Sequence, residues 1–201
     1  MKLYYSPGAC SLSPHIILRE SGLVFEPILA STKTKTLADG TDYNAINPKG
    51  QVPLLELDDG ERLSEGPVIV QFVSDQVPQK KLLPPAGTLA RLRVLEWLNF
   101  ITSEIHKGYS PLFRPEMPEE GKAFHRNRLA ARYQWIDGQL AGKSYLTGED
   151  FTPADSYLFT VTRWAKGTGV DAGGPNVAAF MERVAARPAV QEAMKVEGLL
   201  K

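Results

Sequence analysis

The chain has 201 residues, 43% of them hydrophobic, and its 23 Lys and Arg are balanced by 23 Asp and Glu. This composition fits one compact unit or two small domains and excludes an intrinsically disordered chain. The charge balance argues against nucleic acid and against an anionic membrane as partners. No apolar run approaches the roughly 18 residues of a membrane span, and the N-terminus lacks the apolar core of a signal peptide. We therefore expect a cytoplasmic protein without membrane contact.

The first part of the chain alternates between strand and helix signals. Residues 2–5 read as a buried strand, and a helix capped by Ser11 or Ser13 follows it. Residues 24–29 predict a second strand, which a right-handed crossover would place parallel to the first. The polar residues 31–46 predict an irregular segment or a short helix. The expected result is an α/β unit of small-domain size.

A turn and a hairpin follow in the stretch 47–66. Asn47–Gly50 is a turn signal, because proline fixes φ and glycine tolerates positive φ. Residues 52–57 and 61–64 predict antiparallel strands joined by an Asp-Asp-Gly turn. Pro53 lies at the mouth of the first of these strands, and the sequence leaves the cis or trans state of its peptide bond open.

The helix after the hairpin begins at Glu65-Gly66-Pro67. The helix dipole favours a carboxylate in the first turn, and a glycine there lets a ligand approach the first backbone amides. An ordinary capped helix after a hairpin is the simpler interpretation of the same residues when they are considered alone. These residues alone therefore favour a helix cap and leave a ligand site as the alternative.

Clustered prolines over residues 77–87 end this α/β unit, and the pattern beyond them is helical. We expect a domain of residues 1–80, a linker of residues 81–87 and an all-α domain of residues 88–201. Thr152 to Asp155 has the pattern of a capping box. The predicted helices of the second domain cover residues 89–107, 119–140, about 153–164 and 177–186, with a short tail helix after Pro188.

Cys10 is the only cysteine, which excludes an intramolecular disulfide and a multi-cysteine zinc site. It stands between a glycine-bearing turn and the start of a helix, where a thiolate is favoured. A small buried hydrophobe is the alternative. Ser11, Ser13, Tyr4 and Tyr5 are further hydroxyl donors near it, each with an ordinary structural role as a cap or strand residue.

His106 lies in the first helix of the second domain, with Asn99 and Ser103 at the preceding helical spacings. In an α-helix these three side chains share one stripe, which could face a ligand or only solvent. His15 and His125 lie in a helix interior and in a charged segment. Their spacing does not match that of metal ligands, so we expect no metal.

Four regions of the chain resemble the glutathione S-transferase family, and together the match covers essentially all 201 residues. Val52-Pro53 with Glu65-Gly66 is typical of the superfamily, whereas Cys10 with His106 indicates the bacterial beta class. The matching regions are MKLYYSPGACSLS at the start, NPKGQVP at 47–53 with LSEG at 63–66, EWLNF at 96–100 through His106-Lys107, and FTPADSYLF at 151–159.

This resemblance implies an α/β N-terminal domain of thioredoxin-like fold, an all-α C-terminal domain, a homodimer, and glutathione as cosubstrate. Val52, ahead of a cis Pro53, would pair its backbone with the cysteinyl part of glutathione, and Cys10 and His106 would be the catalytic residues near the sulfur. The implied glutathione contacts are Cys10, Lys35, Val52, Glu65, Gly66, Asn99, Ser103, Glu104, Ile105 and His106.

Individual roles follow from the same resemblance. Glu65 and Gly66 would hold the γ-glutamyl end, and Lys35 would meet the glycine carboxylate. Many classes carry serine where this chain has Gly66, so only backbone contact is available there. Thr152 and Asp155 match a helix cap of the family and are structural.

The resemblance implies conjugation of glutathione to a small hydrophobic electrophile. Because a cysteine can form a mixed disulfide with glutathione, we expect weak conjugation and appreciable thiol-disulfide exchange through Cys10. A glutathione-dependent dehalogenase or isomerase and a non-catalytic binding protein are the alternatives. Tyr109, Phe113 and Trp164 could line an apolar pocket for the second substrate or belong to the core.

Overall fold

The computed structural model describes residues 1–200 and divides the chain into two compact units. The first unit combines Met1–Leu83 with the chain from Arg187 onward, and the second comprises Pro84–Ala186. The sequence-based division, with a second domain of residues 88–201, assigns the last helix differently. That helix carries an apolar stripe that packs against the first unit, and a sequence pattern does not indicate which unit such a stripe will contact.

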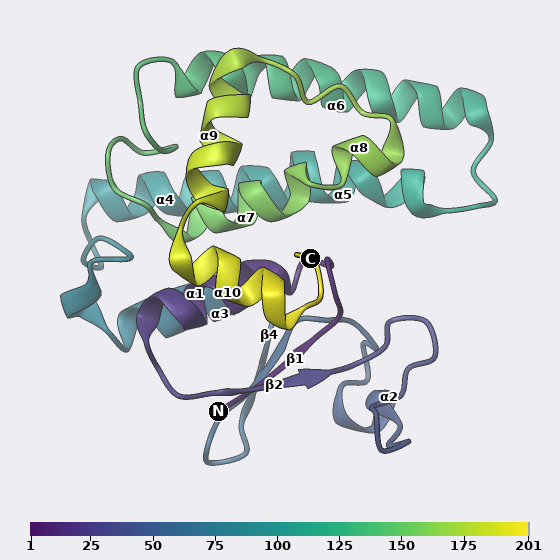
Figure 1. Ribbon diagram of the computed structural model, residues 1–201, viewed down its shortest axis with the longest axis vertical. Helices are drawn as coiled ribbons and strands as arrows, with labels where there is room; N and C mark the ends of the chain where they lie inside the picture. The colour runs from purple at the N-terminus through teal and green to yellow at the C-terminus, as the bar shows by residue number, and fades with distance from the viewer. Residues whose placement is uncertain (201) are drawn as a thin grey trace. The chain divides into compact units, whose positions relative to one another are not determined.

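The first unit is built on a four-stranded mixed sheet in the order β2-β1-β3-β4. As predicted, β1 pairs with β2 in parallel, and β3 and β4 form an antiparallel hairpin. β3 also pairs antiparallel with β1, which joins the two halves of the sheet (Figure 1). The strands are β1 (Lys2–Tyr5), β2 (Glu26–Leu29), β3 (Leu54–Glu56) and β4 (Arg62–Ser64).

The helices of the first unit are α1 (Leu12–Ser21), the short α2 (Tyr43–Ile46), α3 (Gly66–Asp75) and α10 (Pro188–Val196), with a 3-10 turn at Pro78–Lys80. Figure 1 shows α10 in yellow beside α1 in purple, although they are far apart in the sequence. Arg19 of α1 donates to Glu192 of α10 at 2.8 Å, and Arg187 donates to Glu20 at 2.6 Å. Charged pairs therefore reinforce the apolar contact between these two helices.

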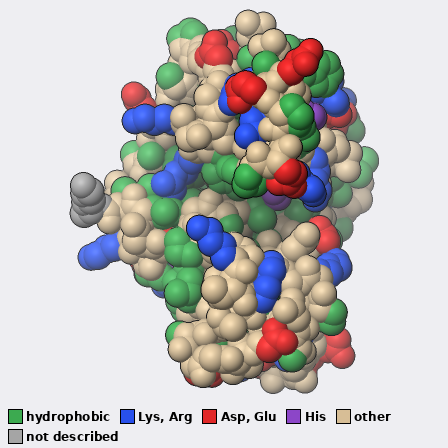
Figure 2. Space-filling model, turned by 90° about the vertical axis from the view of Figure 1, so that its right-hand side faces the viewer, with side chains coloured by type: hydrophobic (Ala, Val, Ile, Leu, Met, Phe, Trp, Pro, Cys, Tyr) green, Lys and Arg blue, Asp and Glu red, His purple; other side chains and the backbone are tan. Residues whose placement is uncertain are grey.

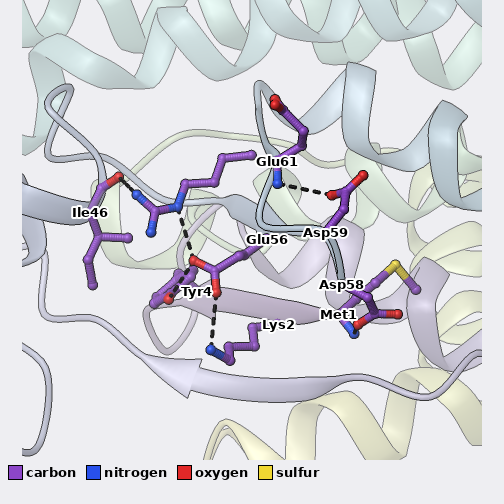
Figure 3. Close-up of polar contacts among 9 residues, drawn as sticks. Met1, Lys2, Tyr4, Ile46, Glu56, Asp58, Asp59 and Glu61 are labelled. Carbon is purple, nitrogen blue, oxygen red and sulfur yellow. Dashed lines mark hydrogen bonds and ion pairs between the residues drawn. The ribbon is translucent and has the colours of Figure 1, made fainter.

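A row of polar side chains crosses the sheet from β1 to β4 (Figure 3). The strand register places Glu56 opposite both Lys2 and Arg62, and its carboxylate accepts from Lys2 Nζ at 3.1 Å and from Arg62 Nε at 3.0 Å. Burial alone raises the pKa of Glu56, but the hydrogen bonds from Lys2 and Arg62 outweigh burial and lower it. Arg62 also donates to the Ile46 carbonyl at 2.8 Å, which ties the chain before the Asn47 turn to the hairpin.

The second unit is all-α. Every residue of α7 is buried, so α7 is the central helix, as its apolar sequence predicts. The helices are α4 (Leu89–Phe100), α5 (Lys107–Tyr109), α6 (Glu119–Leu140), α7 (Pro153–Thr162), α8 (Ala165–Thr168) and α9 (Pro175–Ala185), with a π-helical segment at Ile101–His106 and a 3-10 turn at Ser110–Phe113.

The π-helical segment interrupts what the sequence predicts as one regular helix over residues 89–107. Val94, Leu98, Ile101 and Ile105 are buried along these helical residues, whereas Leu92, which has the same apolar spacing from Leu98 and Ile105 in the sequence, is 56% exposed. A π-turn changes which side chains share a face, and it often occurs at functional sites. Hydrophobic periodicity cannot reveal it, because the buried positions still recur every three or four residues.

The described residues, 1–200, contain no helix long and apolar enough to cross a membrane. On the face shown in Figure 2, acidic and basic side chains are interspersed. The balanced composition is therefore also visible as a mixed surface on that face.

Candidate functional site

Three segments of the first unit meet at one end of its sheet. Tyr4 of β1 pairs with Leu54 of β3, and Leu54 pairs with Ser64 of β4. Because both pairs are antiparallel, the chain leaves β1, enters β3 and leaves β4 at the same end. The turn of residues 6–11 and the residue pairs 52–53 and 65–66 therefore lie close together, and Figure 1 shows this end of the strands.

The turn of residues 6–11 is closed by hydrogen bonds across its base. The Ser11 hydroxyl accepts the Ser6 N–H at 3.1 Å and donates to the Ser6 carbonyl at 3.3 Å, and Ala9 N–H donates to the same carbonyl at 3.0 Å. Ser11 is fully buried and stands at the N-cap position of α1 without capping it through its side chain. The predicted helix-capping serine thus closes the turn that carries Cys10.

Cys10 directs its sulfur at the segment that precedes β3. The half-buried thiol donates to the Val52 carbonyl, with Sγ 3.2 Å from the oxygen. The Val52–Pro53 peptide bond is cis, as the family resemblance implies. Cys10 therefore lies beside the backbone of Val52, the residue expected to pair with the cysteinyl part of glutathione.

The alternative hydroxyl groups near Cys10 are less suited to act as nucleophiles. Tyr4 donates to Glu56 at 3.3 Å, and burial, together with the Glu56 charge, raises its pKa. Burial and the charge of Glu197 likewise raise the pKa of Tyr5, while Ser13 is buried in α1. Raised pKa values disfavour a phenolate, so Cys10 is the best nucleophile at this end of the sheet.

Lys35 reaches the same region from the segment before α2. Its backbone has a φ of 57°, unusual for a residue with a side chain, and its ammonium donates to the Gly50 carbonyl at 2.6 Å. Gly50 stands two residues before Val52, so the charge lies near the chain that enters β3. An ammonium group has three donors and can serve a ligand carboxylate as well.

Glu65 and Gly66 form the start of α3. Glu65 has a φ of 69°, a strained value that is often found at functional sites. Its carboxylate, with the side chain 62% exposed, accepts from Lys49 Nζ at 2.9 Å. A Cβ at Gly66 would lie 3.8 Å from Pro53 Cγ, so the first helical amide is next to the cis-proline. This helix start can offer a donor and a carboxylate to a ligand.

His106 ends the π-helical segment of the second unit and packs against α7. Its Nδ1 lies 2.6 Å from the Tyr157 hydroxyl, and its ring centroid lies 5.1 Å from that of Trp164. The hydrogen bond and the ring contact fix the imidazole plane.

The other candidate residues of the second unit differ in exposure and in their partners. Asn99 and Ser103 are exposed, and Ser103 donates to the Asn99 carbonyl at 3.1 Å. Glu104 turns toward α6, where hydrogen bonds from Arg128 and Arg132 lower its pKa. Ile105 is fully buried.

An aromatic cluster adjoins His106 within the second unit. Trp164 lies 5.6 Å from Tyr109 and 5.5 Å from Phe113, measured between ring centroids. Tyr109 is fully buried and donates to the Tyr133 hydroxyl at 3.0 Å, so it belongs to the core. Phe113 is 55% exposed. Phe113 and Trp164 are thus better placed than Tyr109 to meet an apolar ligand.

The sequence does not identify Tyr157 and Lys49 as partners of the candidate site residues. Tyr157 reads as one more apolar residue of a buried helix, and Lys49 as part of a turn. Only the fold brings them to His106 and Glu65. No local sequence signal identifies either one. Among residues 1–200, no group of three or more His, Cys, Asp or Glu is arranged to hold a metal ion.

An α/β unit with a cis-proline beside a cysteine, followed along the chain by an all-α unit, is a thioredoxin-like architecture with a helical second domain. Sequence models of two domains match this chain. The model for the glutathione S-transferase N-terminal domain matches residues 8–76, and that for the C-terminal domain matches residues 100–188. The chain therefore belongs to the glutathione S-transferase family and has its fold.

Individual relatives agree with this. Glutathione S-transferase GstA of Escherichia coli O157:H7 is 49% identical over 200 residues, which cover 99% of this chain and 100% of that protein. A sphingomonad glutathione S-transferase solved in complex with glutathione has a TM-score of 0.95, 42% identity and 100% coverage of both chains. A bacterial beta class glutathione S-transferase of Sphingomonas chungbukensis also has a TM-score of 0.95, with 41% identity and 100% coverage of both. The predicted family, beta class and transferase activity are confirmed.

Proposed function

We propose that this transferase binds glutathione at the end of the sheet in the first unit and exchanges thiols and disulfides through Cys10. The observation that carries the proposal is the 3.2 Å contact between Cys10 Sγ and the Val52 carbonyl. Val52 and its cis-proline offer backbone groups for the cysteinyl part of an extended ligand. A ligand bound there would bring its own sulfur to the Cys10 sulfur.

The charged groups around Val52 support an orientation for glutathione. Glu65 and the first amide of α3 would hold the γ-glutamyl end, whose ammonium needs a carboxylate and whose own carboxylate needs a donor. The Lys35 ammonium, now on the Gly50 carbonyl, would take the glycine carboxylate. The glutathione contacts predicted for Asn99, Ser103, Glu104, Ile105 and His106 stay predictions.

The exchange reaction balances with glutathione as the only reductant. The Cys10 thiolate attacks the glutathione sulfur of a mixed disulfide, which forms a Cys10–glutathione disulfide and releases the other half as a thiol. A second glutathione thiolate then attacks that disulfide, releases oxidised glutathione and restores Cys10. Conjugation to a small hydrophobic electrophile would need only a bound glutathione thiolate. The exposed Phe113 beside Trp164 is our candidate surface for that electrophile.

Calorimetric titration with glutathione tests the binding site. Replacing Glu65 with Gln removes a charge-assisted contact, so we expect roughly 10- to 100-fold weaker binding. Glu61→Gln changes an exposed carboxylate of the same hairpin and should bind like the wild type. Equal affinity in the two variants would remove Glu65 from the site. Absence of glutathione binding by the wild type would contradict the proposal itself.

We also propose that the protein is a homodimer, and a cytoplasmic location remains our prediction. The second unit exposes large apolar side chains, among them Leu89, Leu92 and Trp135. Trp135, Trp97 and Phe100 line a hollow of about 490 Å³, and aromatic residues are enriched at protein interfaces. Light scattering should give twice the chain mass for the wild type and for Phe124→Glu, but a lower mass for Trp135→Glu. A monomeric wild type at micromolar concentration would contradict the dimer.

A further inference from the structure

Glu197 follows α10 and is buried against the opening turn of the chain. Its side chain and that of His15 are both completely buried. Oε2 of Glu197 accepts the Gly8 N–H at 2.9 Å, and Oε1 accepts the His15 Nδ1–H at 2.9 Å. A buried carboxylate is costly unless its oxygens are hydrogen-bonded. This carboxylate is therefore fixed by two donors from separate segments of the first unit.

The contact to Gly8 completes the support of the turn that carries Cys10. Ser11 closes the base of that turn through Ser6, and Glu197 holds the amide of Gly8, which has a φ of +69°. Leu199 covers the same glycine, because a Cβ at Gly8 would lie 3.5 Å from its Cδ2. Residues that follow α10 thus brace the turn on the side opposite its base.

His15 keeps Glu197 in this position. The imidazole ring lies between Tyr5 and Phe25, with ring centroids 5.7 Å and 5.6 Å away. It belongs to α1, which begins two residues after Cys10. One oxygen of the Glu197 carboxylate is therefore bound to α1, which follows the turn, and the other oxygen is bound to the turn itself.

We infer that Glu197 is a positioning residue for the reaction of Cys10. Through the Gly8 amide it keeps the turn of residues 6–11 in the conformation that holds the Cys10 sulfur at the Val52 carbonyl. This inference rests on the proposed function for its kinetic consequence, while its structural part concerns the turn alone.

Attachment of α10 can be separated from support of the turn. The pairs Arg19–Glu192 and Arg187–Glu20 also connect the α10 region to α1, and neither of them contacts residues 6–11. Glu192→Gln is accordingly a matched control for Glu197→Gln. Both substitutions remove one carboxylate charge that is paired with α1, but only the second changes the acceptor of Gly8.

The test compares wild type, Glu197→Gln, Glu197→Ala and Glu192→Gln by three measurements. These are amide hydrogen exchange of Gly8, alkylation of Cys10 by iodoacetamide, and reduction of a small glutathione mixed disulfide. In the Glu197 variants we expect Gly8 exchange to be roughly tenfold faster and disulfide reduction to be roughly tenfold slower. Alkylation should be several-fold faster, because release of the turn exposes the half-buried thiol. Glu192→Gln should match the wild type in all three.

Opposite movement of the alkylation and reduction rates is a result that a general loss of stability would not produce. If Glu197→Ala does not fold, Glu197→Gln still decides the matter. Folded Glu197 variants that keep wild-type exchange at Gly8 and wild-type reduction rates would overturn the inference, whatever their melting temperature. If the wild type itself reduces no disulfide, the proposed function is wrong. Gly8 exchange and Cys10 alkylation would then still test whether Glu197 supports the turn of residues 6–11.

Discussion

The candidate residues of the two units are held in place by different means. In the first unit, strand register, a closed turn and a cis-proline place Cys10, Val52 and Glu65 largely through the backbone. In the second unit, His106 takes its position from a π-helical turn and from the side chain of Tyr157. Placement by backbone tolerates many side-chain substitutions, whereas placement by one side chain does not. Apart from the buried Glu197, which supports the turn of Cys10 through its side chain, single substitutions remote from the ligand should therefore impair the second group more readily than the first.

The largest expected effect concerns the start of α7, which carries Tyr157. The fully buried Asp155 carboxylate accepts the N–H of Leu146 at 2.9 Å and that of Thr152 at 2.8 Å. Asp155→Ala leaves these donors without partners, so we expect a loss of about 3 kcal/mol in the free energy of unfolding. Urea unfolding measures it, with the exposed Asp150→Ala as the control. A loss below about 1 kcal/mol would mean that water or a local shift replaces the cap.

The free energies of unfolding of wild type and Asp155→Ala should also depend differently on pH. Burial outweighs the hydrogen bonds and raises the pKa of Asp155 from 3.8 to about 6. Because the folded-state pKa lies above the unfolded one, the folded state binds more protons between these values, and this group favours folding less as pH rises. The stability difference between wild type and Asp155→Ala should be about 1 kcal/mol larger at pH 5 than at pH 7. A stability difference that is larger at pH 7 than at pH 5 would mean that folding lowers the pKa of Asp155.

Tyr157→Phe tests the side-chain placement of His106 directly. The substitution removes the hydroxyl that lies 2.6 Å from Nδ1. We expect kcat/KM for conjugation to fall roughly fivefold, the equivalent of one hydrogen bond of about 1 kcal/mol. The dissociation constant of glutathione should change less than kcat/KM, because Lys35, Glu65 and the Val52 backbone are not altered. Tyr133→Phe removes a buried hydroxyl that contacts Tyr109, so it should lose similar stability and keep full activity. Equal kinetics in the two variants would exclude a positioning role for Tyr157.

The smallest effect is expected at Glu104. Its carboxylate is 2.9 Å from Arg132 and 3.2 Å from Arg128, in ion pairs that are partly exposed. Pairs of this kind contribute about 0.5 kcal/mol, so Glu104→Gln should change stability little and weaken glutathione binding less than threefold. If Glu104→Gln weakens glutathione binding as much as Glu65→Gln does, Glu104 is one of the main glutathione contacts. The candidate residues of the two units would then differ less in their importance for binding.

The sequence predicts the first unit well because its signals are local. Proline and glycine in the stretch 47–53, the Asp-Asp-Gly turn and the strand alternation determine the hairpin and its register. That register then brings the segments of Cys10, Val52 and Glu65 to one end of the sheet. The long helix α6 and the helix α7, which begins with a capping box, are also predicted from local signals.

The features that the sequence does not predict depend on contacts between distant segments. The π-helical segment keeps the apolar spacing of an α-helix, so the sequence predicts one regular helix where the fold has an α-helix followed by a π-helix. The unit to which α10 belongs depends on apolar packing and on buried partners such as His15 and Glu197. These partners are separated by 182 positions along the chain.

The measurement closest to the central claim follows two reactions of wild type, Cys10→Ala and Cys10→Ser. One is reduction of a small glutathione mixed disulfide, and the other is conjugation of glutathione to an aromatic electrophile. We predict that both variants lose disulfide reduction by roughly 100-fold or more, because the covalent intermediate cannot form, and that conjugation persists. If both variants reduce the disulfide at the wild-type rate, Cys10 is a packing residue, and the account of this site as a centre of thiol exchange is wrong.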